Sequence, residues 1–195
     1  MLDPIYYLYP SLPALVRTAP PPLGFDEFLR QVRQFLPSKA VQILQDATLF
    51  QDQPRPARLT VLNRWYAREH AVRNELAVLR ARHKGIDPRR YLRSVAKDHE
   101  AVAIAREAFE IESPIKAADY LDQRRWDFLD GLEVGQDFNL ERLAIYLLRL
   151  RLLQRRGPHD PVEGEQWLGN CLKRTEELTR SAIHEYGEII DNNQS

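Results

Sequence analysis

Five histidines and one cysteine are the side chains of this chain best suited to metal binding or catalysis, and their spacing decides what they can do. Two histidines four residues apart, or a glutamate and a histidine three apart, would project two metal ligands from one face of a helix. Neither spacing occurs among the histidines, which are His70, His83, His99, His159 and His184. We therefore expect exposed or helix-capping histidines and no metal site.

The remaining patterns also argue against catalysis. Cys171 lies within an apolar stripe, where a thiol behaves as a small buried hydrophobe rather than as a nucleophile. The eight glycines stand singly and form neither a Walker A nor a dinucleotide-binding loop. We therefore predict a protein that is not an enzyme and uses no cofactor. The single cysteine favours a reducing compartment, and Asp3 and Pro4 do not fit a secretory signal, so we expect cytoplasmic localisation.

Two charged segments leave other functions open. The acidic segment 119–133 could supply oxygen ligands to a hard cation, although a solvated face paired with basic helices explains it more simply. The basic stretch 80–97 could contact phosphates. However, 28 Lys and Arg balance 28 Asp and Glu, so no global field attracts nucleic acid, which is disfavoured as a partner. The acidic residues are Asp119, Asp122, Asp127, Asp130 and Glu133, and the basic ones are Arg80, Arg82, Lys84, Arg89, Arg90, Arg93 and Lys97.

The first part of the chain, residues 1–57, reads as an extended arm followed by a helical hairpin. Residues 5–9 form an apolar, tyrosine-rich run, and the prolines after it disfavour helix, so we predict a short extended, proline-rich N-terminal arm. Helical spacing then predicts a helix over 25–36, and Ser38 can cap a second one to about residue 49. The proline-containing stretch 51–56 predicts a boundary.

Residues 58–195 read as the main helical body, expected to form one compact unit. A long helix is predicted over 60–83 with Gly85 as its stop, and Asp87 and Ser113, each followed by proline, mark two helix starts. Asn139 can cap a strongly apolar helix over 140–156, and a last helix is predicted over 161–190. The longest apolar run, residues 143–148, is too short to span a membrane. The predicted fold is an all-α, irregular multi-helix bundle.

Three segments resemble an uncharacterised bacterial family whose members are typically encoded among V/A-type ATPase subunits. They are YYLYPSLPAL, PPLGFDEFL and ADYLDQRRWDFLDGLEVGQDFNLERLAIYLLRLRLLQR. The resemblance covers residues 6–156 and includes the pattern Tyr120, Leu121, Trp126, Gly135, Phe138 and Leu140, whose large side chains we expect in the core. It implies a counterpart of the helical C/d-type component of V-type ATPases, which sits on the membrane rotor ring, receives the central stalk and supports ion transport without catalysing ATP hydrolysis.

The first hypothesis is therefore a non-catalytic subunit or assembly factor of a V/A-type ATPase, a helical adaptor that binds the rotor stalk or membrane ring and is peripheral to the membrane through that complex. Alternatives are a helical nucleic-acid-binding or regulatory protein-interaction module, and an enzyme with a carboxylate metal site on 119–133. Aromatic and arginine side chains dominate protein interfaces. The candidate partner-binding residues are Tyr6, Tyr7, Tyr9, Arg142, Arg149 and Arg151.

Overall fold

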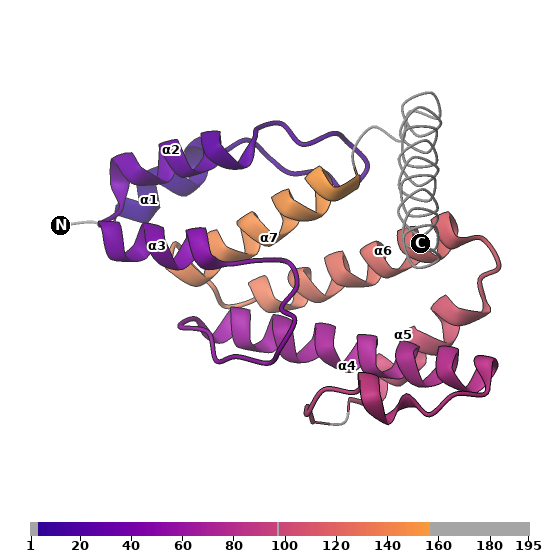
Figure 1. Cartoon of the computed structure of the whole chain (residues 1–195). Helices are drawn as coiled ribbons and strands as arrows, with labels where there is room; N and C mark the ends of the chain where they lie inside the picture. Colours follow the sequence, from indigo (N-terminus) through magenta and orange to yellow (C-terminus); the bar gives the residue numbers. More distant parts are fainter. Residues whose placement is uncertain (1–3, 97, 157–195) are drawn as a thin grey trace, which may run out of the picture. The chain divides into compact units, whose positions relative to one another are not determined.

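The computed structural model describes residues 4–96 and 98–156, and every regular element in this part of the chain is a helix (Figure 1). The chain divides into two compact units, Met1–Arg155 and Arg156–Ser195. The helix expected over 161–190, which contains Cys171 and His184, lies outside the described residues, and so does His159. The predicted all-α fold is confirmed for the described part.

The N-terminal run is helical, and the prediction of an extended arm there is wrong. Helix α1 covers Pro4–Ser11. Ile5 and Leu8 lie about one turn apart on its inner face and are 5% and 0% exposed. Burial of this face outweighs the disfavouring effect of Pro10, while Pro4, in the first turn, removes no hydrogen bond the helix needs. Irregular backbone follows only from residue 12 to residue 24.

The expected hairpin is present as α2 (Phe25–Phe35) and α3 (Ser38–Asp46). Ser38 is the first helical residue and not the cap, because Pro37, with φ −65° and ψ 151°, already turns the chain into the helix. The long helix α4 (Thr60–Lys84) ends as predicted at Gly85, whose φ of 66° is left-handed. Residues on both sides of the expected boundary at 51–56 contribute to one apolar cluster.

Four side-chain caps start the helices that follow. Asp87 accepts a hydrogen bond from the Arg89 amide, but only one 3-10 turn follows, η1 (Pro88–Tyr91). Asp98, which no sequence prediction singled out, caps α5 (His99–Glu110) by accepting from two amides. Ser113 caps α6 (Pro114–Glu133), and Asn139 accepts from the Arg142 amide at the start of α7 (Leu140–Arg156). The last two predictions are confirmed.

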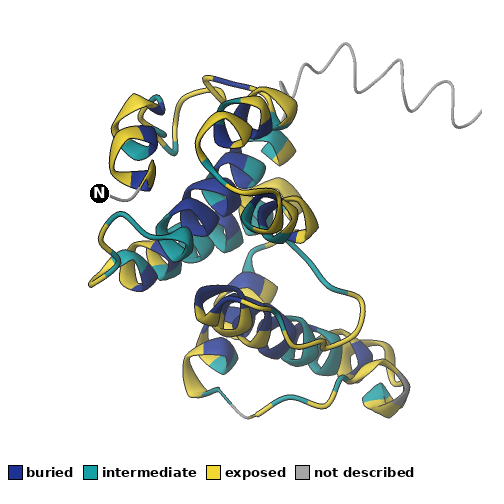
Figure 2. Cartoon of the chain, turned by 90° about the vertical axis from the view of Figure 1, so that its left-hand side faces the viewer, coloured by how far each residue is buried: buried dark blue, intermediate teal, exposed yellow. Residues whose placement is uncertain are grey.

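The helices bury two apolar clusters. The larger joins α1, α2, α3 and α7 to the first half of α4 and the end of α6, and α7 is buried along most of its length (Figure 2). The smaller joins the second half of α4 to α5 and the start of α6. Helix α5 runs parallel to α4, because Arg68 pairs with Asp98 before its start while the His83 ring lies 5.9 Å from the Phe109 ring near its end.

The aromatic and leucine residues of the family-like pattern pack at the margins of these clusters. Tyr120 and Leu121 lie against the smaller cluster, and Trp126, Phe138 and Leu140 against the larger. All five are half-buried. They pack against the core but are not buried within it as expected, and the fully buried large aromatics of the described residues are Trp65 and Phe28.

Candidate functional site

A surface of aromatic and arginine side chains forms where α1 crosses the turn between α6 and α7. We call it the tyrosine surface; its members are Tyr6, Tyr7, Tyr9, Phe138 and Arg142. The inner face of α1 is buried, so Tyr6 and Tyr7 are left 45% and 57% exposed. Their rings meet edge to face at 5.4 Å, and the Tyr6 ring lies 5.0 Å from that of Phe138. Sequence-distant residues thus form one exposed aromatic cluster.

Arg142 lies at the centre of this cluster. Its guanidinium carbon stands 4.5 Å from the centroid of the Tyr9 ring and 5.9 Å from that of Phe138. Both Arg142 and the Tyr9 hydroxyl bind the Glu133 carboxylate, each at 3.1 Å. The cation is therefore held over an aromatic face and its position is fixed before any partner arrives.

Glu133 organises the charges beneath the surface. Burial alone would raise the pKa of this carboxyl, but hydrogen bonds from Arg149 and Tyr9, with the positive charges of Arg149 and Arg142, lower it below its ordinary value. Arg149 binds Glu133 at 2.6 Å, pairs with Asp130 and stands 5.5 Å from the Trp126 ring. The carboxylate thus stays ionised and joins two arginines of α7 to α1.

The turn 134–139 holds Phe138 in an uncommon backbone conformation. Its φ of 39° is the single positive value among the described non-glycine residues. Gly135, with φ 79°, allows the turn, and the Asn139 side chain donates to Gln136 at 2.8 Å. Arg142 also donates to the Gln136 carbonyl at 3.1 Å. A strained aromatic residue fastened on both sides is typical of a functional position.

Tyr146 supports the surface from below. Its ring stacks on Phe28 with centroids 5.6 Å apart and meets Tyr9 edge to face. Its hydroxyl donates to the Pro13 carbonyl at 2.8 Å, which fixes the chain leaving α1. Burial, followed by the nearby Tyr9, raises the pKa of Tyr146 well above its usual range, so the phenol stays protonated as a donor.

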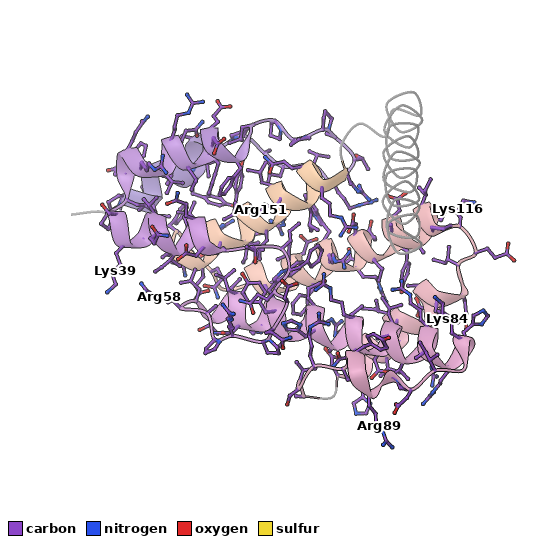
Figure 3. The ribbon with its side chains drawn as sticks, in the orientation of Figure 1. Lys39, Arg58, Lys84, Arg89, Lys116 and Arg151 are labelled. Atoms are coloured by element: carbon purple, nitrogen blue, oxygen red, sulfur yellow. The ribbon has the colours of Figure 1, made fainter. Side chains whose placement is uncertain are left out.

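The structure brings together five of the six predicted partner-binding residues. Tyr6, Tyr7, Tyr9 and Arg142 belong to the tyrosine surface, and Arg149 contacts it through Glu133. Arg151, also on α7 (Figure 3), instead lies 4.1 Å from the centroid of Phe25, and burial lowers its pKa. Sequence reasoning missed Phe138 as a surface residue and Glu133 as its organiser. The available signal was the position of Phe138 between Gly135 and the Asn139 cap, and that of Glu133 two residues before Gly135.

The acidic segment does not gather into a cation site in the described part of the chain, where no group of three or more potential ligands converges. Glu133 and Asp130 bind arginines of α7, and Asp127 accepts from Gln123 at 2.6 Å. Asp122 is buried and pairs with Arg125 at 2.8 Å. Asp130 and Glu133 thus join α6 to α7, while Asp122 and Asp127 pair with side chains of their own helix.

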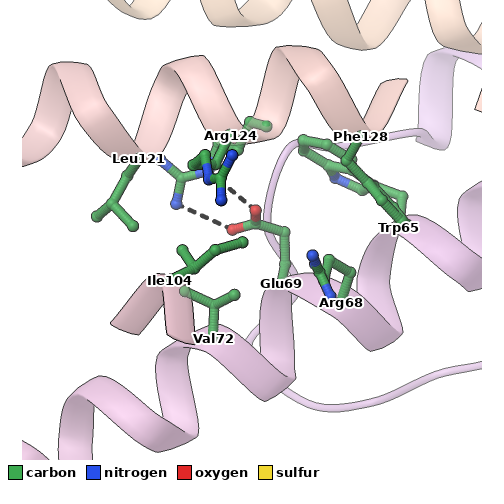
Figure 4. Close-up of a pocket in the computed structure, with 9 residues that line it drawn as sticks. Trp65, Arg68, Glu69, Val72, Ile104, Leu121, Arg124 and Phe128 are labelled. Carbon is green, nitrogen blue, oxygen red and sulfur yellow. Dashed lines mark hydrogen bonds and ion pairs between the residues drawn. The ribbon is translucent and has the colours of Figure 1, made fainter. Parts of the chain in front are cut away.

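The interior pocket between α4, α5 and α6 is too small for a substrate (Figure 4). Its volume is about 10 Å³, barely one water. Arg125 makes two hydrogen bonds to the Glu69 carboxylate, at 2.9 and 3.0 Å, with both side chains at most 10% exposed. We infer a structural ion pair that links α6 to α4 where the two apolar clusters meet. Around this pocket are Trp65, Arg68, Val72, Ile104, Leu121, Arg124 and Phe128.

His70 contradicts the expectation of exposed or capping histidines. It is 2% exposed, and neither ring nitrogen has a hydrogen-bond partner. Burial, then the charges of Arg93 and Arg73, lowers its pKa below 6.5, while Glu69 opposes the shift. The imidazole is therefore buried in its neutral form.

No helix of the described residues is both long enough and apolar enough to cross a membrane. Comparisons of the chain with protein families, with curated proteins and with solved structures find no significant match.

Proposed function

We propose that this chain is a non-catalytic subunit or assembly factor of a V/A-type ATPase, a helical adaptor that binds the rotor stalk or membrane ring through the tyrosine surface. The observation that carries the proposal is the pair of exposed rings of Tyr6 and Tyr7, of which Tyr6 contacts the half-buried Phe138. The immobilised guanidinium of Arg142 lies over the neighbouring rings of Tyr9 and Phe138. Tyrosine and arginine are the residues most enriched among those that dominate binding energies at interfaces.

Preorganisation strengthens this interpretation. Association loses free energy when mobile side chains are ordered. Here the guanidinium of Arg142 is already held by Glu133 and the Gln136 carbonyl, so a partner that contacts it orders little. The resemblance to a family encoded among ATPase subunits supplies the partner, because its segments contain every residue of the tyrosine surface.

Binding to purified ATPase subunits tests the proposal. The chain is immobilised, and the rotor-stalk subunits and the detergent-solubilised membrane ring are applied separately at micromolar concentration. The variant Tyr6→Ser/Tyr7→Ser should bind its partner at least about 30-fold more weakly, the loss of one strong interface residue of about 2 kcal/mol.

The control is Ile115→Ser, which removes a hydrophobic side chain that is 63% exposed near the start of α6 and belongs to another part of the molecule. It should bind as the parent does. Absence of binding to any subunit at both low and moderate salt would refute the proposal, and so would equal losses in the two variants. The purified chain should hydrolyse no ATP on its own, and deleting its gene should disassemble or uncouple the complex.

A further inference from the structure

We propose that the segment 80–93, at the end of α4 and through η1, is a second binding surface that docks on a bilayer containing anionic lipids. The segment reads RARHKGIDPRRYLR and holds six lysines and arginines against one acid, Asp87, in a chain whose total charge is zero. The segment therefore carries a local excess of positive charge, although the chain as a whole has none.

Apolar side chains stand among these cations. Ile86, Tyr91 and Leu92 are 47%, 56% and 42% exposed, and they are three of the ten large hydrophobic residues that the described chain exposes. Cations at the end of α4 complement the helix dipole, which accounts for Arg82 and Lys84. The dipole accounts neither for Arg89, beyond the helix, nor for the exposed apolar residues. Cations interleaved with aliphatic and aromatic side chains are typical of surfaces that lie at a membrane interface.

The segment is fastened at both ends and presents its middle to solvent. At one end Gly85 closes α4 with a φ of 66°, and the Ile86 amide donates to the Ala81 carbonyl at 2.9 Å. At the other end the Asn74 side chain makes two hydrogen bonds to the Arg93 backbone, at 2.7 and 2.9 Å. Between them Arg89 is 89% exposed and points away from the helices (Figure 3).

This geometry favours a bilayer over other anionic partners. Ile86 and Leu92 offer nothing that a phosphate backbone binds, and single-stranded nucleic acid is held by several stacking aromatics, of which this segment has one. A bilayer accepts apolar side chains at headgroup depth without needing a complementary shape, while its anionic headgroups attract the cations. The Phe109 ring lies 5.9 Å from that of His83, and the exposed Glu110 and Glu112 follow Phe109, so the chain is acidic and not basic at the end of α5.

Vesicle binding tests this inference. The full chain is mixed with vesicles of phosphatidylcholine, alone or with phosphatidylglycerol, and the bound fraction is measured by sedimentation. We expect binding only to the anionic vesicles and its loss at high salt. The variant Arg82→Gln/Lys84→Gln/Arg89→Gln should bind roughly 100-fold more weakly. The reason is that removal of one or two cations from a surface that binds anionic lipids lowers the affinity about tenfold.

Two further variants make the test specific. Arg30→Gln/Arg33→Gln/Lys39→Gln removes three exposed cations of the α2 and α3 hairpin, gives the same net charge and should bind as the parent does. Ile86→Ser/Leu92→Ser keeps every charge and should weaken binding at least about tenfold. Equal losses in the two glutamine variants, equal binding to neutral vesicles, or preference for an RNA oligonucleotide over anionic vesicles would overturn the inference.

The experiments can refute the membrane-binding inference and the proposed function independently of each other. Subunit binding is measured without vesicles, so the glutamine variant of 80–93 should retain it. Conversely, Tyr6→Ser/Tyr7→Ser should bind vesicles as the parent does.

Discussion

The rings of Tyr6 and Phe138 lie 5.0 Å apart, although 132 positions separate them in the sequence and Phe138 has a left-handed backbone with a φ of 39°. Side chains other than glycine rarely adopt that conformation, which costs about 1–2 kcal/mol. The turn 134–139 therefore retains strain at the point where it contributes a ring to the tyrosine surface.

Substitution of Phe138 by alanine and by glycine distinguishes the contribution of its ring from that of its strained backbone. Both substitutions remove the contacts with Tyr6 and Tyr9 and should weaken partner binding. Phe138→Gly also relieves the left-handed strain, partly offset by the greater freedom of glycine in the unfolded chain. It should unfold with a free energy about 0.5–1 kcal/mol above that of Phe138→Ala in urea denaturation. An alanine variant as stable as the glycine variant would show that the backbone is unstrained.

The two tryptophans of the larger cluster should differ in their effect on stability. Trp65 is 0% exposed and its indole donates to the Leu49 carbonyl at 2.9 Å, so Trp65→Ala should lower the free energy of unfolding by about 3–5 kcal/mol. Trp126, predicted from sequence to be a core residue, is half-buried below Arg149, and Trp126→Ala should cost less. Chemical denaturation of both variants measures the difference, and the reverse order would contradict the burial.

Arg125 should be more costly to remove alone than together with its partner. Arg125→Met leaves the buried Glu69 carboxylate without its two hydrogen bonds, and we expect a loss of about 3–5 kcal/mol. Adding Glu69→Leu removes one of the two buried carboxylates that pair with Arg125, the other being Asp122, and should restore part of that loss. Thermal and urea unfolding of the single variants and the double variant complete a cycle, in which additive losses would mean that the ion pair does not couple α4 to α6.

His70 should make folding stability sensitive to mild acid. Its folded pKa lies below 6.5, so from pH 6.5 downward the unfolded chain binds a proton that the folded chain does not. The free energy of unfolding should therefore fall as the pH decreases from about 6.5 toward the folded pKa. The groups that set this shift are Arg73, Arg93 and Glu69.

The comparison variant is His70→Leu, which should show a smaller decrease in stability between neutral pH and mild acid. Glu133 and Asp98, whose pKa values are also lowered, lose their contributions only below their ordinary values of 4.5 and 3.8, so they do not interfere in this window. If the free energy of unfolding depends on pH in the same way in the parent and in His70→Leu, a group other than His70 causes the dependence.

Helix periodicity and capping residues predicted much of this fold. Gly85, Ser113 and Asn139 end or begin helices where local chemistry placed them, because a left-handed glycine and a side-chain acceptor act within one turn. Helix α1 could not be predicted in the same way. Its local signal, dominated by prolines, disfavours helix, whereas burial of Ile5 and Leu8 in the larger apolar cluster favours it.

The candidate site was predicted as residue types but not as an arrangement. Exposed tyrosines and the arginines of α7 suggested an interface, yet nothing local indicated that Tyr9 and Arg142 would share Glu133. Nor does sequence spacing place Arg151 beside Phe25 while Arg149 faces Trp126. These pairings depend on how α7 packs between α2 and α6, which only the tertiary structure determines.

The contacts that hold α1 have a consequence for the order of events during synthesis. The hydrogen bond from Tyr9 to Glu133 spans 124 positions, and that from Tyr146 to Pro13 spans 133. A nascent chain can pair α4 with α5 while translation continues, because those helices are close in sequence. Helix α1 can contact α2 early, but its hydrogen bonds with Glu133 and Tyr146 form only after residue 146 has left the ribosome. The complete tyrosine surface is therefore available only after translation has passed α7, so the proposed binding through Tyr6 and Tyr7 would follow folding.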